Sequence, residues 1–248
     1  MGIGGFIITG DGPKPVIIRA IGPTLARSGI AGVLSDPILE LHGPGEFLTI
    51  RNDNWKDSQE SEIEATGVPP TDDAESAIVA TLQPGAYTAI VEGSGNSSGV
   101  ALIEIYDLNP DADSKLANLS TRALVATGED IIIAGFLLND RESVERIVVR
   151  GIGPSMAPGV FPAASVLADP ILELRDGNGS LLGSNDDWQD IATQSAEIRA
   201  AGLAPTNSLE SAMAVTLSPG MYTTLLFGRA NGTGIGVVEI YDLGAPKP

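Results

Sequence analysis

The chain contains the same pattern twice, and this duplication constrains its fold more than any other feature. Its landmarks are Asp-Pro-Ile-Leu-Glu-Leu at 36–41 and 169–174, Asn-Asp-(Asn/Asp)-Trp at 52–55 and 185–188, and Pro-Gly-(Ala/Met)-Tyr-Thr at 84–88 and 219–223. The first two landmarks recur after 133 residues (169 − 36 and 188 − 55), whereas Tyr87 and Tyr222 are 135 apart, so the second copy carries a two-residue insertion. The duplication predicts two domains of one fold, each with its own core.

The composition favours a folded, mostly β chain. Of the 248 residues 43% are apolar, which is enough to build cores, and the 30 Gly and 17 Pro suit short strands joined by turns. There is no cysteine, which excludes disulfides, cysteine metal sites and cysteine nucleophiles.

The charge excludes several classes of partner. A formal net charge of −18, from 32 acidic and 14 basic residues, repels nucleic acid and anionic lipid. No apolar run approaches the ~20 residues of a membrane-spanning helix, so we expect no membrane insertion. Met1 leads directly into an apolar stretch at 2–8 without a basic leader, so we expect a processed chain or a piece of a longer one.

Turn residues and β-branched runs outline the strands. They are predicted at 5–10, 15–21, 38–41, 47–50, 76–82, 87–92 and 100–106, and in the second copy at 135–138, 146–152 and 236–241, with small-residue loops at 24–35 and 155–168 and a polar turn at 139–143. Apolar residues on both faces of 102–106 predict strands packed between layers. A capping-box pattern at 57–60, repeated at 190–201, predicts one short helix after each tryptophan.

Two charged residues recur at matching places. Arg19 and Arg150 each end an apolar run, and we expect a strand arginine paired with a carboxylate such as Glu40 or Glu104, a binding role being the alternative. Glu75, which Glu210 matches, begins a strand after a Pro-Thr turn and is expected to accept backbone hydrogen bonds from that turn.

One strand occurs only once. After a linker at 107–115, the segment 116–127 is predicted to be a strand, and no copy of it precedes the first repeat. We therefore expect domains at 1–110 and 111–248, of which only the second has this leading strand. An incomplete sheet recruits strands from other chains; the alternatives are a mere connector or a chain divided at this point. The candidate assembly residues are Leu116, Leu119, Thr121, Leu124 and Val125.

The tryptophan motif is also a candidate metal site. Its oxygen-bearing side chains suit Ca²⁺, which takes six to eight oxygen ligands; they are Asn52, Asp53, Asn54, Asp57, Asn185, Asp186, Asp187 and Asp190. The alternative is structural, with Asx side chains closing turns and Asp57 and Asp190 capping the helices. Trp55 and Trp188 are expected in the core, a carbohydrate-stacking platform being the alternative.

Signals of catalysis are weak. The single histidine, His42, lies in a predicted hairpin turn, and its counterpart is Arg175, so no Ser-His-Asp triad recurs in both copies. No G-x-S-x-G elbow is present, and the glycine-rich segment 93–99 lacks the lysine and helix of a phosphate loop. The sequence therefore predicts a protein that is not an enzyme.

The repeat resembles known bacterial modules. Residues 81–91 with 100–107 are similar to the pre-peptidase C-terminal type of β-sandwich domain, and the motifs at 19–23, 36–41, 52–55, 75–77 and 114–122 resemble a tandem repeat of large secreted or surface bacterial proteins. The resemblance covers nearly the whole chain. It implies jelly-roll-like sandwiches, an extracellular or cell-surface setting and a structural or accessory role.

Together these observations predict two tandem jelly-roll-like β-sandwich domains, each with one short α-helix. The expected function is a non-enzymatic structural or adhesive module that joins copies of itself, or neighbouring repeats, head to tail into a filament, stalk or surface layer. The alternative is a calcium- or carbohydrate-binding accessory module of a secreted protein. No cofactor is expected unless Ca²⁺ binds.

Overall fold

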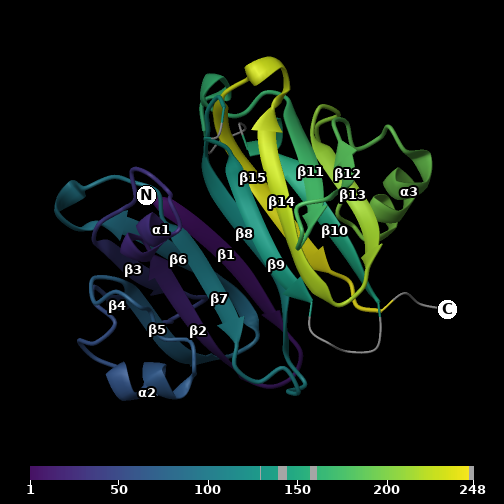
Figure 1. The fold of residues 1–248 in the computed structure, drawn as a ribbon. Helices are drawn as coiled ribbons and strands as arrows, with labels where there is room; N and C mark the ends of the chain where they lie inside the picture. Colours follow the sequence, from purple (N-terminus) through teal and green to yellow (C-terminus); the bar gives the residue numbers. More distant parts are fainter. Residues whose placement is uncertain (129, 139–143, 157–160, 246–248) are drawn as a thin grey trace. The chain divides into compact units, whose positions relative to one another are not determined.

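A computed structural model describes residues 1–128, 130–138, 144–156 and 161–245 (Figure 1). The chain divides into two compact units, Met1–Ala117 (unit 1) and Asn118–Pro248 (unit 2). This boundary lies seven residues after the one predicted between 110 and 111 (117 − 110). Each unit is a sandwich of antiparallel sheets with few helices, so the predicted fold class is confirmed.

Unit 1 consists of two sheets. The first has the order β1 (Gly2–Thr9), β6 (Gly85–Gly93), β3 (Pro37–His42) and β4 (Ile50–Asn52). The second has the order β5 (Ser76–Leu82), β2 (Lys14–Ile21) and β7 (Leu102–Asp107). All the pairings are antiparallel.

Unit 2 repeats this arrangement and adds a strand. One sheet has the order β9 (Ile132–Leu138), β14 (Gly220–Gly228), β11 (Pro170–Asp176) and β12 (Leu181–Asn185). The other has the order β13 (Ser211–Leu217), β10 (Glu145–Ile152), β15 (Gly234–Asp242) and β8 (Lys115–Val125), of which the residues from Asn118 onward belong to unit 2. Strands β1 to β7 thus correspond in order to β9 to β15, and β8 is the additional strand.

The sheet that contains β2 or β10 is buried on both faces. In unit 2, the inter-sheet core includes Val149 and Leu172, whereas Val148 faces a second cluster with Trp188 and Ile198. In unit 1, Ile17 packs with Trp55 and Ile63 in the corresponding outer cluster. Alternate side chains of these central strands enter different clusters. Strand β7, for which packing between layers was predicted, is only half-buried, and its Leu102 is 41% exposed.

The outer clusters are formed with one helix after each tryptophan, as predicted. They are α2 (Glu60–Ala65), which contacts β5, and α3 (Ala192–Ala200), which contacts β13 (Figure 1). The predicted capping by Asp57 and Asp190 is wrong, because the N-cap residues are Gln59 and Ile191 and neither makes a capping side-chain hydrogen bond.

The two-residue insertion lies at the start of α3. Gln59 bonds the backbone N–H and carbonyl of Val79, at 3.1 and 2.9 Å, and Gln194 accepts from Ala214 N–H at 3.4 Å. These glutamines are 135 residues apart, whereas Asp57 and Asp190 are 133 apart, so the insertion falls between 190 and 194. Gln194 therefore joins the longer α3 to β13 as Gln59 joins the start of α2 to β5.

Two other predictions differ from the structure. The loop predicted at 24–35 contains the short helix α1 (Pro23–Arg27), which begins with proline, a residue suited to the first helical turn. The strand predicted at 47–50 begins only at Ile50, because Phe47 N–H closes a turn on the carbonyl of Pro44 at 3.2 Å and its ring packs edge-on against Tyr87 with ring centroids 5.6 Å apart. The polar turn predicted at 139–143 lies outside the described residues.

Four single-turn 3₁₀ segments complete the described structure; they are η1 (Ser94–Asn96), η2 (Pro154–Met156), η3 (Ala163–Ser165) and η4 (Arg229–Asn231). None of the helices in the described ranges combines the length and the apolar character required to cross a bilayer.

Candidate functional site

The two units differ most at the edge of the sheet that contains β7 or β15. In unit 2, β15 pairs with β10 on one side and with β8 on the other, with Val238 opposite Thr121. In unit 1, β7 pairs with β2, and no described strand of this unit pairs with its other side. The edge of β7 is therefore open where the edge of β15 is covered.

The register shows which backbone groups face the open edge. Leu108 donates its N–H to the carbonyl oxygen of Pro15 at 3.0 Å, in register with the β2–β7 pairs. Hydrogen-bonded pairs recur at every second residue of an antiparallel ladder. Leu102, Glu104 and Tyr106 therefore bond β2, whereas the N–H and C=O groups of Ile103 and Ile105 point outward.

The side chains at this edge are only partly covered. Ile103 packs over Gly4 of β1, since a Cβ added there would lie 3.2 Å from Ile103 Cγ2, so Ile103 faces the inter-sheet core. Ile103 and Ile105 are half-buried, whereas their counterparts Val238 and Ile240 are 0% and 5% exposed. On the opposite face, Leu102 is 41% exposed. An isoleucine pair at the rim of a core is thus left incompletely buried.

The predicted assembly residues lie in β8, where the structure gives them different environments. Val125 is fully buried and belongs to the inter-sheet core of unit 2, whereas Leu124 is 67% exposed on the other face. Leu119 and Thr121 are half-buried and lie opposite Ile240 and Val238. Leu116 is half-buried and lies in the part of β8 that belongs to unit 1. From Asn118 onward, β8 thus forms part of a sheet of unit 2, where it pairs with β15.

A small pocket of about 190 Å³ lies on the outer face of unit 1, next to the open edge. Its lining includes Leu102 and Glu104 of β7, together with Leu25 and Glu75. Small-molecule pockets usually have about 300–1,000 Å³, so this one is better matched to a single side chain than to a free ligand.

Glu75 is fully buried at the base of this pocket. Its Oε1 accepts hydrogen bonds from the N–H groups of Gly22 and Thr24, at 3.2 and 2.8 Å, while Oε2 has no partner in the described residues. Its counterpart Glu210 is better satisfied, because Ser155 Oγ donates to its Oε2 at 2.5 Å. The expected bonds from the Pro-Thr turn are wrong for Glu75, since its donors belong to the loop after β2.

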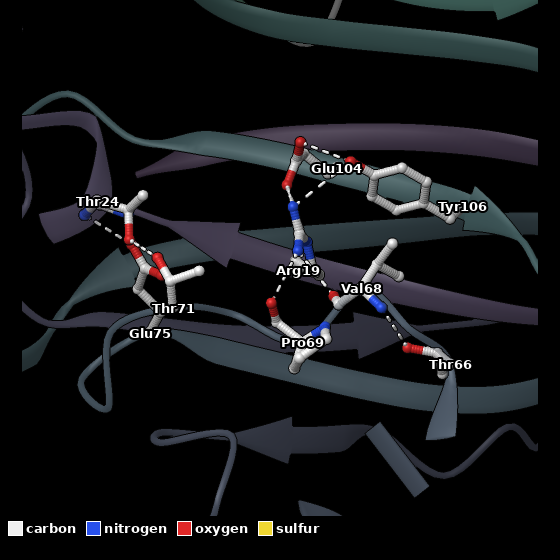
Figure 2. Close-up of polar contacts among 10 residues, drawn as sticks. Arg19, Thr24, Thr66, Val68, Pro69, Thr71, Glu75, Glu104 and Tyr106 are labelled. Atoms are coloured by element: carbon white, nitrogen blue, oxygen red, sulfur yellow. Dashed lines mark hydrogen bonds and ion pairs between the residues drawn. The ribbon is translucent and has the colours of Figure 1, made fainter. Parts of the chain in front are cut away.

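Arg19 holds the polar cluster beside the pocket together (Figure 2). Its Nε donates to Glu104 at 2.9 Å, and its Nη1 donates to the carbonyl of Val68 at 2.7 Å. Arg150 repeats this in unit 2, with Nε to Glu239 at 2.7 Å. The predicted strand ion pair is thus confirmed with Glu104, and Glu40 instead contacts His42 at 3.2 Å. Burial and the Glu104 carboxylate raise the pKa of Tyr106.

A separate acidic cluster lies in unit 2. Oxygen atoms of Asp169, Asp186 and Asp187 lie within 4.8 Å of one another, and each residue has one buried oxygen without a partner among the described atoms. Burial, then the neighbouring Asp186, raises the pKa of both Asp169 and Asp187. Arg229 opposes this charge, with its Nη1 2.6 Å from Asp186. Sequence reasoning missed Asp169, because it lies directly before β11, far in the sequence from the tryptophan motif.

The corresponding place in unit 1 carries less charge. By the 133-residue offset, Asp36, Asp53 and Asn54 match the three aspartates, so one carboxylate is replaced by an amide. Asp53 also has a buried oxygen without a partner in the described part of the chain. Asn54 Nδ2 donates to Asp57 at 3.3 Å. The proposed metal ligands therefore do not converge equally in the two units.

Two of the predicted ligands serve the backbone. The amide oxygens of Asn52 and Asn185 accept from the N–H groups of Ala77 and Ala212, at 3.0 and 2.8 Å. Their Nδ2 groups donate to the carbonyls of residues 54 and 187. These buried asparagines thus join the tryptophan loop to the neighbouring strand. Asp190, whose backbone N–H closes a turn on the carbonyl of residue 187, lies on the exposed surface.

The tryptophans lie in the core, as expected. Trp55 and Trp188 are each 5% exposed, and their indole N–H groups donate to the carbonyls of Asp72 and Asn207, at 3.1 and 3.2 Å. A ring buried to this extent presents no stacking face to a sugar.

Comparisons with known proteins identify no family for this chain. No family model matches it, and no curated protein matches it. Among solved structures, the crystal structure of the STIV MCP is 14% identical in sequence and has a TM-score of 0.26. The match covers 98% of this chain and 91% of the STIV MCP chain. The atomic structure of Sulfolobus Turreted Icosahedral Virus is 12% identical, with 96% and 85% covered and a TM-score of 0.25.

Proposed function

We propose that this chain is a non-enzymatic structural or adhesive repeat module that assembles through the open edge of β7. Its partners are copies of itself or neighbouring repeats, joined head to tail at the cell surface or outside the cell. The resemblance of the repeat to modules of secreted bacterial proteins supports the extracellular setting.

The observation that carries the proposal is the difference between β7 and β15. The described residues form two equivalent edges of this kind, and β8 covers the second of them, whereas no described strand of unit 1 covers the first. A row of outward N–H and C=O groups beside half-buried isoleucines favours the addition of another strand. Edge pairing would satisfy these groups and complete the rim of the core of unit 1.

The test is particle mass in solution as a function of protein concentration, measured by size exclusion with light scattering and by electron microscopy. We expect mass to rise with concentration for the natural chain. The variant Ile103→Pro should stay monomeric, because proline removes an outward N–H without breaking a β2 bond. A second variant, Leu102→Lys, leaves the backbone intact and charges the edge, and it should weaken assembly as well.

The matched control is Leu48→Lys, at a residue that is 85% exposed and lies outside both edges. It should assemble like the natural chain. Circular dichroism verifies that each variant is folded. A natural chain that remains monomeric at all concentrations, or a folded Ile103→Pro variant that assembles normally, would contradict the proposal.

A second candidate function is calcium binding by unit 2. The three converging aspartates, with their unpaired buried oxygens, favour it, because a divalent cation would relieve their mutual repulsion. Calorimetry with Ca²⁺ and melting curves with and without chelator test this. We expect millimolar Ca²⁺ to raise the melting temperature of the natural chain but not that of Asp187→Asn. No shift in the natural chain would remove this candidate.

A further inference from the structure

We propose that β7 accepts an antiparallel strand with the pattern of residues 118–125, in the register in which β8 pairs with β15. This inference rests on the proposed assembly function and specifies the partner segment. Unit 2 supplies the template, because its β15 corresponds to β7 residue by residue and carries such a strand.

The register follows from the correspondence between the two units. Tyr106 and Tyr241 are 135 residues apart, so Ile103 matches Val238 and Ile105 matches Ile240. In unit 2, Val238 lies opposite Thr121, and Ile240 lies opposite Leu119. Residues equivalent to Thr121 and Leu119 would therefore exchange hydrogen bonds with the outward groups of Ile103 and Ile105.

The side chains that face the core have to be small or apolar. In β8, Ala123 and Val125 pack into the inter-sheet core, and Thr121 shares their face because side chains alternate along a strand. A strand with this pattern would cover Ile103 and Ile105 from the side. It would give them the burial that Val238 and Ile240 have in unit 2.

The outer face selects a different side chain. The residue equivalent to Arg122 would lie opposite Leu102, because Arg122 lies opposite Val237 in unit 2. Leu102 borders the small pocket that Glu75 and Glu104 also line. Arg19 also lines this pocket and already pairs with Glu104, and in unit 2 the guanidinium of Arg122 lies 5.2 Å from the centre of the Phe161 ring. The β8 pattern thus places a long side chain opposite the exposed Leu102, where its alkyl part would cover apolar surface.

A third feature fixes the start of the strand. Asn118 Nδ2 donates to the carbonyl of Ile240 at 3.0 Å in the buried part of unit 2. The corresponding carbonyl on β7 belongs to Ile105, and it points to the open edge. An asparagine at the first position of the incoming strand would therefore have an acceptor in unit 1 as well.

The experiment uses a synthetic peptide with the sequence of residues 116–127 as the probe. Its binding to the whole chain is measured by fluorescence anisotropy, and its site by hydrogen exchange. We expect saturable binding and about tenfold slower exchange confined to 102–107. Protection elsewhere, or displacement of β8 from β15 without protection of β7, would overturn the inference.

Two peptide variants test the register. The Thr121→Pro peptide lacks the N–H that should bond Ile103, and its affinity should fall at least about tenfold. The Ser120→Pro peptide is the control, because the N–H of Ser120 points away from β7 in this register, and it should bind nearly as well as the natural peptide. Equal affinities of the Thr121→Pro and natural peptides would contradict the register.

The two proposals can fail separately. A chain that stays monomeric but binds the peptide at β7 would contradict self-assembly and support the acceptor edge. A chain that assembles but does not bind the peptide would contradict the proposed strand and leave self-assembly supported.

Discussion

The side-chain amide of Asn118 donates a hydrogen bond of 3.0 Å to the carbonyl oxygen of Ile240, and this bond joins the first residue of unit 2 to β15. Asn118 is 7% exposed, and the bond lies beside the ladder between β8 and β15. The leading strand is thus held by a side chain as well as by its backbone.

We expect Asn118→Ala to lower the free energy of unfolding of unit 2 by about 1 kcal/mol, because a buried hydrogen bond is lost. Each unit has one tryptophan, so urea unfolding in a Trp55→Phe background reports on unit 2 through Trp188. Leu124→Ala is the control, since Leu124 is 67% exposed and should change stability little. Equal stability of the natural chain and Asn118→Ala would show that the ladder alone holds β8.

Glu210→Ala should destabilise unit 2 by about 2–4 kcal/mol, because several donors lose a buried, charged acceptor. Gly153 N–H and Ser155 N–H donate to its Oε1 at 3.0 and 2.8 Å. Glu75→Ala should cost unit 1 less, because Oε2 of Glu75 has no partner among the described atoms. Urea unfolding followed at Trp188 and at Trp55 separates the two effects. A larger loss in unit 1 would contradict this order.

Gly153→Ala should unfold unit 2 or reduce its stability by more than about 2 kcal/mol, because the added Cβ would overlap the carbonyl oxygen of Leu167. Gly22→Ala should do the same to unit 1 through the carbonyl of Leu34. Gly12→Ala is the control, since no atom lies within 4 Å of its added Cβ. Thermal melting followed by circular dichroism measures all three. A mild effect at Gly153 would mean that the loop after β10 can move aside.

Asp187→Asn should raise the melting temperature of unit 2 at pH 7, by about 1–3 °C. Burial and Asp186 raise the pKa of Asp187 in the folded chain, so its ionisation costs stability. That cost is absent below the unfolded pKa of about 4 and grows as pH rises through the folded pKa. The gain should therefore disappear near pH 3.5. A gain of equal size at both pH values would point to a cause other than charge.

The duplication and its turn signals were sufficient to predict most strands, the helix after each tryptophan and the pairing of Arg19 with a strand carboxylate, whereas the jelly-roll-like sandwich was implied by the resemblance to known modules. Local signals were less reliable at boundaries. The capping-box pattern at 57–60 suggested a helix start at Asp57. In the structure, the side chain of Gln59 bonds the backbone of Val79, and the helix begins at Glu60. Phe47 has a strand-like pattern around it, yet its ring packs on Tyr87 and the strand begins later.

The candidate sites, like the fold, could be predicted from the sequence only in part. The odd strand 116–127 could be recognised by counting repeats, because the printed sequence contains this segment once and the other landmarks twice. The outward direction of the N–H and C=O groups of Ile103 and Ile105 could not be recognised, since it depends on which residues of β7 form the hydrogen-bonded pairs with β2. The convergence of Asp169 with Asp186 and Asp187 was also hidden, because these residues come from different loops that only the folded sandwich brings together.

The position of β8 has a practical meaning for anyone who divides this chain. The duplication within this sequence can be followed from β1 and from β9, whereas the sheet of unit 2 also includes β8, which begins at Lys115. A boundary placed at β9 therefore differs from the boundary of the folded sandwich. A fragment excised at the β9 boundary would lose the strand that seals it, and one excised before Lys115 would keep it.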